Sequence, residues 1–96
     1  MKILKKLPGQ PWHHAEIDNT LEALQQEVGG YIETVTIAPD ACFVCNEEGR
    51  LLNLPYNATI CGVQFVGPLL LVGVNEDEFT DVPDACSDLF AKAVTP

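Results

Sequence analysis

Four cysteines are the residues that first suggest chemistry in this chain. Cys42 and Cys45 have the CxxC spacing of zinc sites and redox centres, and Cys61 and Cys86 complete the ligand count of a structural zinc site. The two residues between the close pair are bulky and apolar, however, and a strand turns the side chains of residues i and i+3 to opposite faces. We therefore expect buried structural thiols without a metal, with a zinc site and a disulfide or redox pair as the alternatives.

Histidines and carboxylates are the next candidates for chemistry. His13 and His14 are adjacent, and neighbouring residues of a strand face opposite ways, so the pair is poorly placed to share one metal ion. Residues 75–78 (NEDE) lack the spaced ligands, central glycine and distal glutamate of a calcium loop. The chain has no phosphate-binding loop, no GxGxxG and no nucleophile elbow. We therefore expect no enzymatic activity and no cofactor.

A third group of polar residues lies between positions 46 and 57. It combines amide, carboxylate, guanidinium and phenol groups, and it contains the chain's one arginine. Loops of this kind on a rigid sheet are where binding residues gather, although asparagine, glutamate and glycine are also ordinary turn residues. The candidate binding residues are Asn46, Glu47, Glu48, Arg50, Asn53, Tyr56 and Asn57.

The framework for these residues is predicted to be a single α+β domain over residues 1–96, with two helices and a mostly antiparallel sheet of six or seven strands. Residues 60–66 and 69–74 are apolar without alternation, which is typical of strands covered on both faces in the middle of a sheet. Residues 46–49 are expected to join a hairpin. The predicted strands are residues 1–7, 13–17, 31–37, 41–45, 50–54, 60–66 and 69–74.

Capping residues and apolar spacing predict the two helices. Asn19 is expected to cap the first, with Glu22 completing a capping box, and Gly29 is expected to end it. Asp81 is expected to cap the second helix, with Asp84 in its first turn. The apolar faces are expected to contain Leu21, Leu24 and Val28 in the first helix, and Cys86, Leu89, Phe90 and Ala93 in the second.

Composition and charge restrict the kinds of partner. The 96 residues are 47% hydrophobic, which is ample for one core, and the formal net charge is −9, from 14 acidic and 5 basic residues. Residues 7–49 contain no lysine or arginine. A surface of this sign repels phosphate backbones and anionic lipid headgroups, so we expect no direct binding of nucleic acid or membrane. The acidic surface either keeps the protein soluble or docks on a basic protein surface.

Location and assembly are also predicted from the apolar segments. Residues 8–11 (PGQP) stand where a signal peptide would need an apolar stretch, and the uncharged run of residues 60–75 is too short for a transmembrane helix. We therefore expect a cytoplasmic protein with reduced thiols. Because residues 60–74 supply more apolar strand than a small sheet would cover, we also expect a homodimer.

Five segments are distinctive when taken in chain order: residues 16–25 (EIDNTLEALQ), 28–33 (VGGYIE), 44–49 (VCNEEG), 54–57 (LPYN) and 67–73 (GPLLLVG). Together they resemble an uncharacterised domain family of bacteriophages, conjugative elements and Gram-positive bacteria. The resemblance extends over nearly the whole chain but implies no activity and no functional residues. It implies a small accessory protein of a mobile element, in the host cytoplasm if phage-encoded, and such proteins often block host defences.

The leading hypothesis is therefore a small acidic binding protein that binds and inhibits a host protein with a basic surface, as a counter-defence factor would. The acidic surface and the predicted hairpin loop would make the contact. The second hypothesis is an oligomeric sponge for a signalling nucleotide, which the net charge disfavours because Arg50 is the one well-placed cation for a phosphate. The third is a zinc-stabilised structural module.

Overall fold

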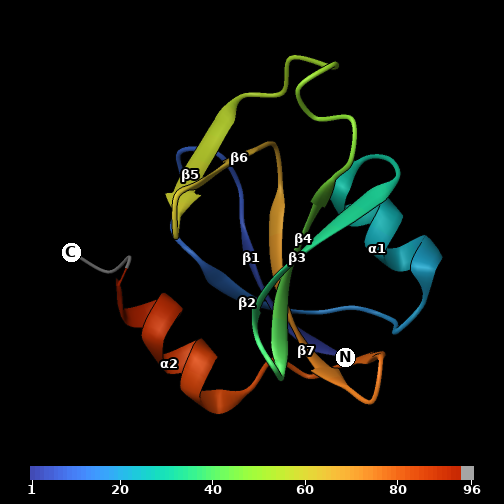
Figure 1. Cartoon of the computed structure of the whole chain (residues 1–96), viewed down its shortest axis with the longest axis vertical. Coiled ribbons are helices and arrows are strands. Elements are labelled where there is room, and N and C mark those ends of the chain that lie inside the picture. The colour runs from blue at the N-terminus through green and yellow to red at the C-terminus, as the bar shows by residue number, and fades with distance from the viewer. Residues whose placement is uncertain (94–96) are drawn as a thin grey trace.

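The computed structural model describes the backbone of residues 1–93 and the side chains of residues 1–90. Over this range it contains two helices, a six-stranded sheet and a second, two-stranded sheet, and the strand pairs are antiparallel (Figure 1). The predicted α+β class is confirmed. In chain order the elements are β1 (Lys2–Lys6), β2 (His13–Glu16), α1 (Leu21–Val28), β3 (Ile32–Ala38), β4 (Ala41–Asn46), β5 (Tyr56–Ile60), β6 (Val63–Val66), β7 (Leu69–Asn75), β8 (Glu78–Thr80) and α2 (Asp84–Ala93).

The centre of the main sheet is β7. The strand order is β2-β1-β7-β4-β3, and β8 also pairs with β7. Leu71 of β7 lies opposite Leu4 of β1 on one edge and opposite Phe43 of β4 on the other. Further along β7, β8 occupies the edge that β1 has left, with Thr80 opposite Gly73. The prediction of a central strand over residues 69–74 is therefore confirmed.

Two hydrophobic clusters lie on the two faces of the main sheet. Successive residues of β7 enter them alternately: Leu69 and Leu71 belong to one cluster, and Leu70 and Val72 to the other. All four side chains have no exposed surface. The first cluster also contains Leu4, Trp12, Phe43 and Phe65, and the second also contains Ile3, Leu24, Val28 and Val44.

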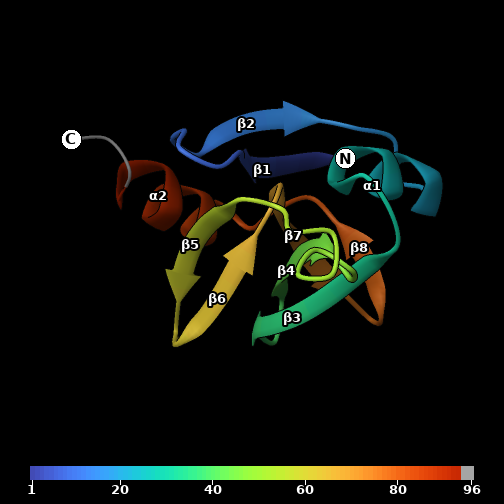
Figure 2. The same cartoon turned by 90° about the horizontal axis from the view of Figure 1, so that it is seen from above.

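Different elements cover the two faces (Figure 2). Helix α1 lies over the second cluster and contributes Leu24 and Val28 to it. Helix α2 and the β5–β6 hairpin lie on the opposite side, where Phe90 of α2 and Phe65 of β6 place their rings 5.5 Å and 5.1 Å from the ring of Phe43. The molecule therefore has three layers, with the main sheet in the middle.

Helix α1 begins one residue later than predicted, because its capping residue is one position further along the chain. Thr20, not Asn19, is the capping residue: its hydroxyl accepts a hydrogen bond of 3.1 Å from the N–H of Ala23. The Asn19 amide instead donates to the carbonyl of Phe79, 2.8 Å away, and so ties the start of α1 to β8. Gly29 ends the helix as predicted, in the left-handed conformation with φ 82°. Leu21, expected on the apolar face, is exposed.

Two predicted strands are wrong. Residues 50–54 do not return as a strand beside β4, because β4 already has β7 on one edge and β3 on the other, and residues 47–53 form turns instead. Residues 60–66 are not a central strand either. They bend at Cys61 and Gly62, with φ of 51° and 79°, and this two-residue turn makes β5 and β6 a separate hairpin.

Helix α2 also differs from its prediction. Asp81 does not cap it: the helix begins at Asp84, and the Asp81 carboxylate accepts a hydrogen bond of 2.7 Å from the backbone N–H of Lys2. Phe90 packs on the core as expected, but Leu89 is 64% exposed. The side chain of Ala93 lies outside the described residues. Neither helix of the described range is long and apolar enough to cross a membrane.

The position of Leu71 at the crossing of three strands predicts a large effect on stability. We expect Leu71→Ala to lower the free energy of unfolding by about 2–5 kcal/mol, because it leaves a cavity in a closed core. Leu51→Ala is the matched control: Leu51 is 81% exposed, and the change should stay within about 0.5 kcal/mol. Urea unfolding followed by circular dichroism measures both. Similar losses in the two variants would contradict the assignment of β7 as the core strand.

Candidate functional site

The structure distributes the four cysteines over separate places. Cys42 lies in the cluster under α1, whereas Cys45 lies in the cluster on the opposite face, as expected for residues i and i+3 of a strand. Cys61 is exposed at the turn between β5 and β6, and Cys86 of α2 is half-buried. Among the described residues, no three His, Cys, Asp or Glu side chains gather in a group that could hold a metal ion.

Burial also makes the inner thiols poor nucleophiles. It raises the pKa of the Cys42 thiol, and burial followed by the nearby charge of Asp40 raises the pKa of Cys86. The pKa of Cys45 rises to about 11, first because of burial and then because of the charge and hydrogen bond of Glu33. These thiols stay protonated at neutral pH, which is typical of structural cysteines.

The two histidines are exposed on β2. The Nε2 atom of His14 lies 3.5 Å from the hydroxyl of Ser87 in α2. Within the described residues, this hydroxyl is the hydrogen-bond partner of the ring. Trp12, directly before them in the chain, is buried and stacks near Phe43 with the ring centroids 6.1 Å apart. Strand β2 with its two histidines is thus a solvent-exposed strand that lies beside an aromatic core.

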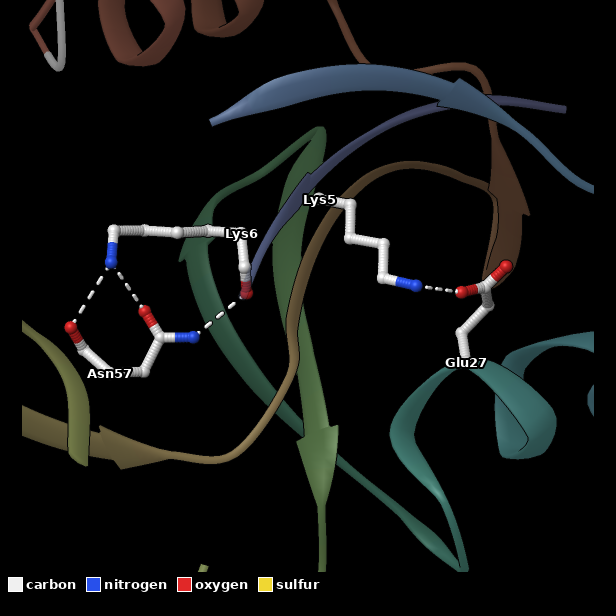
Figure 3. A network of polar contacts seen from close by, with 4 residues as sticks. All are labelled: Lys5, Lys6, Glu27 and Asn57. Carbon is white, nitrogen blue, oxygen red and sulfur yellow. Dashed lines mark hydrogen bonds and ion pairs between the residues drawn. The ribbon is translucent and has the colours of Figure 1, made fainter. Parts of the chain in front are cut away.

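Asn57 is a candidate binding residue whose side chain is used inside the protein (Figure 3). It sits at a register shift of β5, and its amide donates to the carbonyls of Lys6 and Gly67 at 2.8 and 2.7 Å. Its carbonyl oxygen accepts from the Lys6 ammonium, also at 2.8 Å. On the other side of β1, Lys5 is ion-paired with Glu27 of α1. Asn57 therefore anchors the hairpin to β1.

Asn46 has a similar internal role at the end of β4. Its buried amide donates to the carbonyl of Val28, 3.1 Å away, and its side-chain oxygen accepts from the N–H of Glu48 at 2.8 Å. These bonds join the last residue of α1 to the loop that follows β4. Gly30 passes so close that an added Cβ would lie 3.0 Å from the Asn46 amide nitrogen. Asn46 thus positions the loop.

The loop of residues 47–54 is a compact series of turns. Leu52 donates to the carbonyl of Glu48 and Leu54 to that of Gly49, each over 2.9 Å. Gly49 is buried, and a Cβ there would lie 2.8 Å from the side chain of Val66. Asn53 takes a left-handed conformation with φ 55°. The loop therefore folds against β6 and leaves Glu47, Glu48, Arg50, Leu51 and Leu52 exposed.

A groove of about 360 Å³ opens between this loop, β3 and β6. Glu33 and Val35 of β3 form one wall, Val63–Val66 of β6 forms the other, and residues 45–47 and 49–51 close one end. Cys45 and Phe65 are the buried residues of the hydrophobic core that line it, and Leu51 and Val63 are exposed apolar residues on its rim. We call this feature the β3–β6 groove.

The polar groups of the β3–β6 groove come from both walls. The guanidinium of Arg50 donates to the carbonyl of Gln64 over 3.2 Å. Glu33 and Glu47 are exposed and line the same space. The groove therefore combines two carboxylates, one guanidinium and an apolar rim. Such a combination suits the binding of a chain segment with both apolar and charged side chains.

Three of the seven predicted binding residues line the groove: Asn46, Glu47 and Arg50. Glu48, Asn53, Tyr56 and Asn57 do not line it, and the Tyr56 hydroxyl lies 2.8 Å from that of Thr59. Sequence reasoning missed Glu33, Val63 and Gln64. The one usable signal was Gly62, because glycine readily takes the positive φ that a two-residue hairpin turn requires, and this would have made residues 63–66 a separate strand.

A second hollow, of about 490 Å³, lies beside α1. It is lined by Met1, Glu16, Asp18 and Glu27, among others. Glu27 is already paired with Lys5, and the remaining carboxylates are exposed at the end of β2 (Glu16) and on the connection to α1 (Asp18). Although it is larger, this hollow has neither the apolar rim nor the buried core-side residues of the β3–β6 groove.

The fold and the groove together define a small α+β domain with a groove between an edge strand and a hairpin. A family model described as "Domain of unknown function (DUF3846)" matches residues 1–95, and the chain belongs to this family. No curated protein and no solved structure matches the chain. The predicted relationship to an uncharacterised small domain family is confirmed, while its origin in phages or mobile elements stays a prediction.

The hydrogen bonds of Asn57 predict a cost for its removal. Asn57→Ala should lower the free energy of unfolding by about 1–3 kcal/mol, because the buried carbonyl of Gly67 loses its side-chain donor. Asn53→Gly is the control, since it removes an exposed amide at a position where glycine is conformationally at ease. Denaturant unfolding measures both variants. An Asn57→Ala protein as stable as the control would contradict the anchoring role.

The placement of the thiols predicts their order of reaction. In the folded protein at pH 8, iodoacetamide should alkylate exposed Cys61 first, while Cys45 should react far more slowly because it is buried and its pKa is raised to about 11. Tandem mass spectrometry of the tryptic peptides, with fragmentation to assign the label to one cysteine, measures the two rates. Denatured protein serves as the control, in which both thiols should react. Equal rates in the folded protein would contradict the burial of Cys45.

Proposed function

We propose that this protein is a non-enzymatic binding protein that holds a partner protein at the β3–β6 groove. The observation that carries the proposal is the groove itself, in which exposed Leu51 and Val63 flank a space bounded by Glu33, Glu47 and Arg50. Exposed apolar side chains beside a charged cleft are typical of protein-interaction surfaces. Arg50 is the one cation among the lining residues, which is too few for the phosphates of a nucleotide.

Charge supports a basic partner. The chain has a formal net charge of −9, and two of its five basic residues, Lys5 and Lys6, already contact Glu27 and Asn57. Glu33, Glu47 and Glu48 lie exposed at or beside the groove. Opposite charge on a partner would speed association and orient the encounter. The same charges disfavour nucleic acid and anionic membranes as direct partners.

The biological setting is part of the same proposal. The resemblance to domains of phages and conjugative elements suggests an accessory protein of a mobile element that acts in the host cytoplasm by inhibiting a host protein. Assembly as a homodimer also stays a proposal, but its original ground no longer applies. Residues 60–66 belong to the separate β5–β6 hairpin, and residues 69–73 are buried within the chain itself.

The proposal predicts salt-sensitive binding that depends on the groove. The partner is captured from host lysate with the tagged chain, and the association rate is then measured for the purified pair. The association rate should fall by about tenfold or more between about 50 and 500 mM salt, because exposed charges are screened within about 10 Å at 0.1 M. Glu47→Lys with Glu48→Lys should also slow association, and Arg50→Ala should speed dissociation.

The control is a matched charge change away from the groove. Glu76 and Asp77 are exposed at the turn between β7 and β8, and Glu76→Lys with Asp77→Lys changes the net charge by the same amount. This variant should retain more of the association rate than the Glu47 and Glu48 variant. Equal effects of the two double variants, or binding that ignores salt, would show that the groove is not the charged binding surface.

A further inference from the structure

Strand β3 is an edge of the main sheet that no other element covers. Among the described residues, its neighbour is β4 alone, so its outer edge has no partner strand. It is seven residues long, rich in β-branched residues and contains one charge, Glu33. Proteins commonly protect such edges with lysine, proline or very short strands, and β3 has none of these before its irregularity between Thr36 and Ala38. The opposite edge strand, β2, has four residues.

Two observations show which backbone groups of β3 bond to β4 and which point outward. Glu47 donates to the carbonyl of Tyr31 over 2.8 Å, which makes these two residues a hydrogen-bonded pair. On the far side of β4, Val74 donates to the carbonyl of Asp40 over 2.8 Å, so the even-numbered residues of β4 bond to β7 and the odd-numbered ones bond to β3. With Glu33 opposite Cys45, the outward backbone groups of β3 belong to Ile32 and Thr34.

Side chains of β3 alternate with the same period. Glu33 and Val35 line the β3–β6 groove, whereas Ile32 packs on the cluster of the opposite face. A strand added to the outer edge of β3 would therefore send every second side chain towards the groove, beside Glu33 and Val35. On the other wall, the Gln64 carbonyl is turned away from β5, since it accepts from Arg50 over 3.2 Å. The added strand would thus form backbone hydrogen bonds with β3 and place its side chains in the groove at the same site.

Charge decides which strand fits. Glu33 is exposed on β3 and Glu47 lies on the same groove, so an added strand should place a lysine or arginine opposite Glu33 and an aliphatic residue opposite Val35. A second copy of this chain is a poor occupant. Strand β3 contains no cation, so pairing of two β3 strands would leave Glu33 without a positive neighbour in any register.

We propose that the chain recognises an extended basic segment of its partner by strand addition to the outer edge of β3. This inference rests on the proposed function and names its mode of recognition: main-chain hydrogen bonds to Ile32 and Thr34, with selection of alternate side chains by Glu33 and Val35. The partner segment alternates a basic and an aliphatic residue on the side that faces the groove.

A peptide probe tests this mode directly. The probe is the acetylated and amidated sequence Thr-Val-Thr-Lys-Thr, whose valine and lysine fall opposite Val35 and Glu33 in an antiparallel register. Hydrogen exchange of the isotope-labelled protein is followed by NMR with and without probe. At about 90% occupancy the amides of Ile32 and Thr34 should exchange about tenfold more slowly, since they exchange from the free fraction, while Glu33 and Val35, already bonded to β4, should not change.

Matched probes and variants separate the contributions. A probe methylated on the nitrogen of its central threonine keeps every charge but loses a backbone donor, and it should bind about tenfold more weakly. Thr34→Pro should have the same effect, because it removes an outward N–H and no bond to β4. Thr34→Val keeps the N–H and should bind as the parent does. Thermal unfolding of both variants confirms that they fold.

Three outcomes would overturn the inference. The first is binding that shifts the signals of Glu33 and Glu47 without slowing exchange at Ile32 and Thr34, which would leave the proposed function intact with another mode of contact. The second is absence of probe binding at millimolar concentration. The third is slowed exchange at Thr34 without probe together with a dimer in light scattering, which would make a second copy the occupant. Binding unchanged when the probe lysine is replaced by glutamate would instead contradict the proposed function.

Discussion

Residues 69–73 of β7 are buried, and the positions of the other elements follow from the need to cover them. The apolar side chains of β7 alternate between two clusters, so both faces of the strand need a cover, and its backbone is bonded on both edges because an unpaired buried peptide group costs about 1–3 kcal/mol. Gly73 shows how closely the chain is packed there. A Cβ at this position would lie 2.1 Å from the carbonyl oxygen of Asp81, so the segment after β8 passes directly over the strand.

Helix α1 and the β5–β6 hairpin, which cover the two faces of the main sheet, are held to it by polar contacts at their ends. Asn46 fastens the end of α1 to the end of β4, and Asn57 fastens the β5–β6 hairpin to β1. Both amides are buried and both donate and accept hydrogen bonds, so they fix the relative position of elements that hydrophobic contact alone would hold less specifically. Their function is to position the loop and the hairpin that form the groove.

The groove exists because the hairpin covers only part of its face. Phe65 brings β6 down on Phe43 of β4, and the loop after β4 packs against Val66 through Gly49. Strand β3 lies one strand further out and keeps its outer edge open. An edge strand, an apolar rim and exposed carboxylates therefore occur together, and on this combination we base the proposal of a basic partner.

Elements with a local sequence pattern were predictable without the structure. The β-branched run of β3, the leucines of β7 and the glycine that ends α1 were sufficient, because each expresses the conformational preference of a short segment. Asn46, Glu47 and Arg50 were also identified as candidates for binding. Tertiary contacts were needed to show that residues 50–54 form turns, since β4 had no free edge for another strand, and that residues 60–66 belong to a hairpin apart from the main sheet. The tertiary structure also brought Glu33 beside Gln64, because packing of Phe65 on Phe43 joins segments that no local pattern relates.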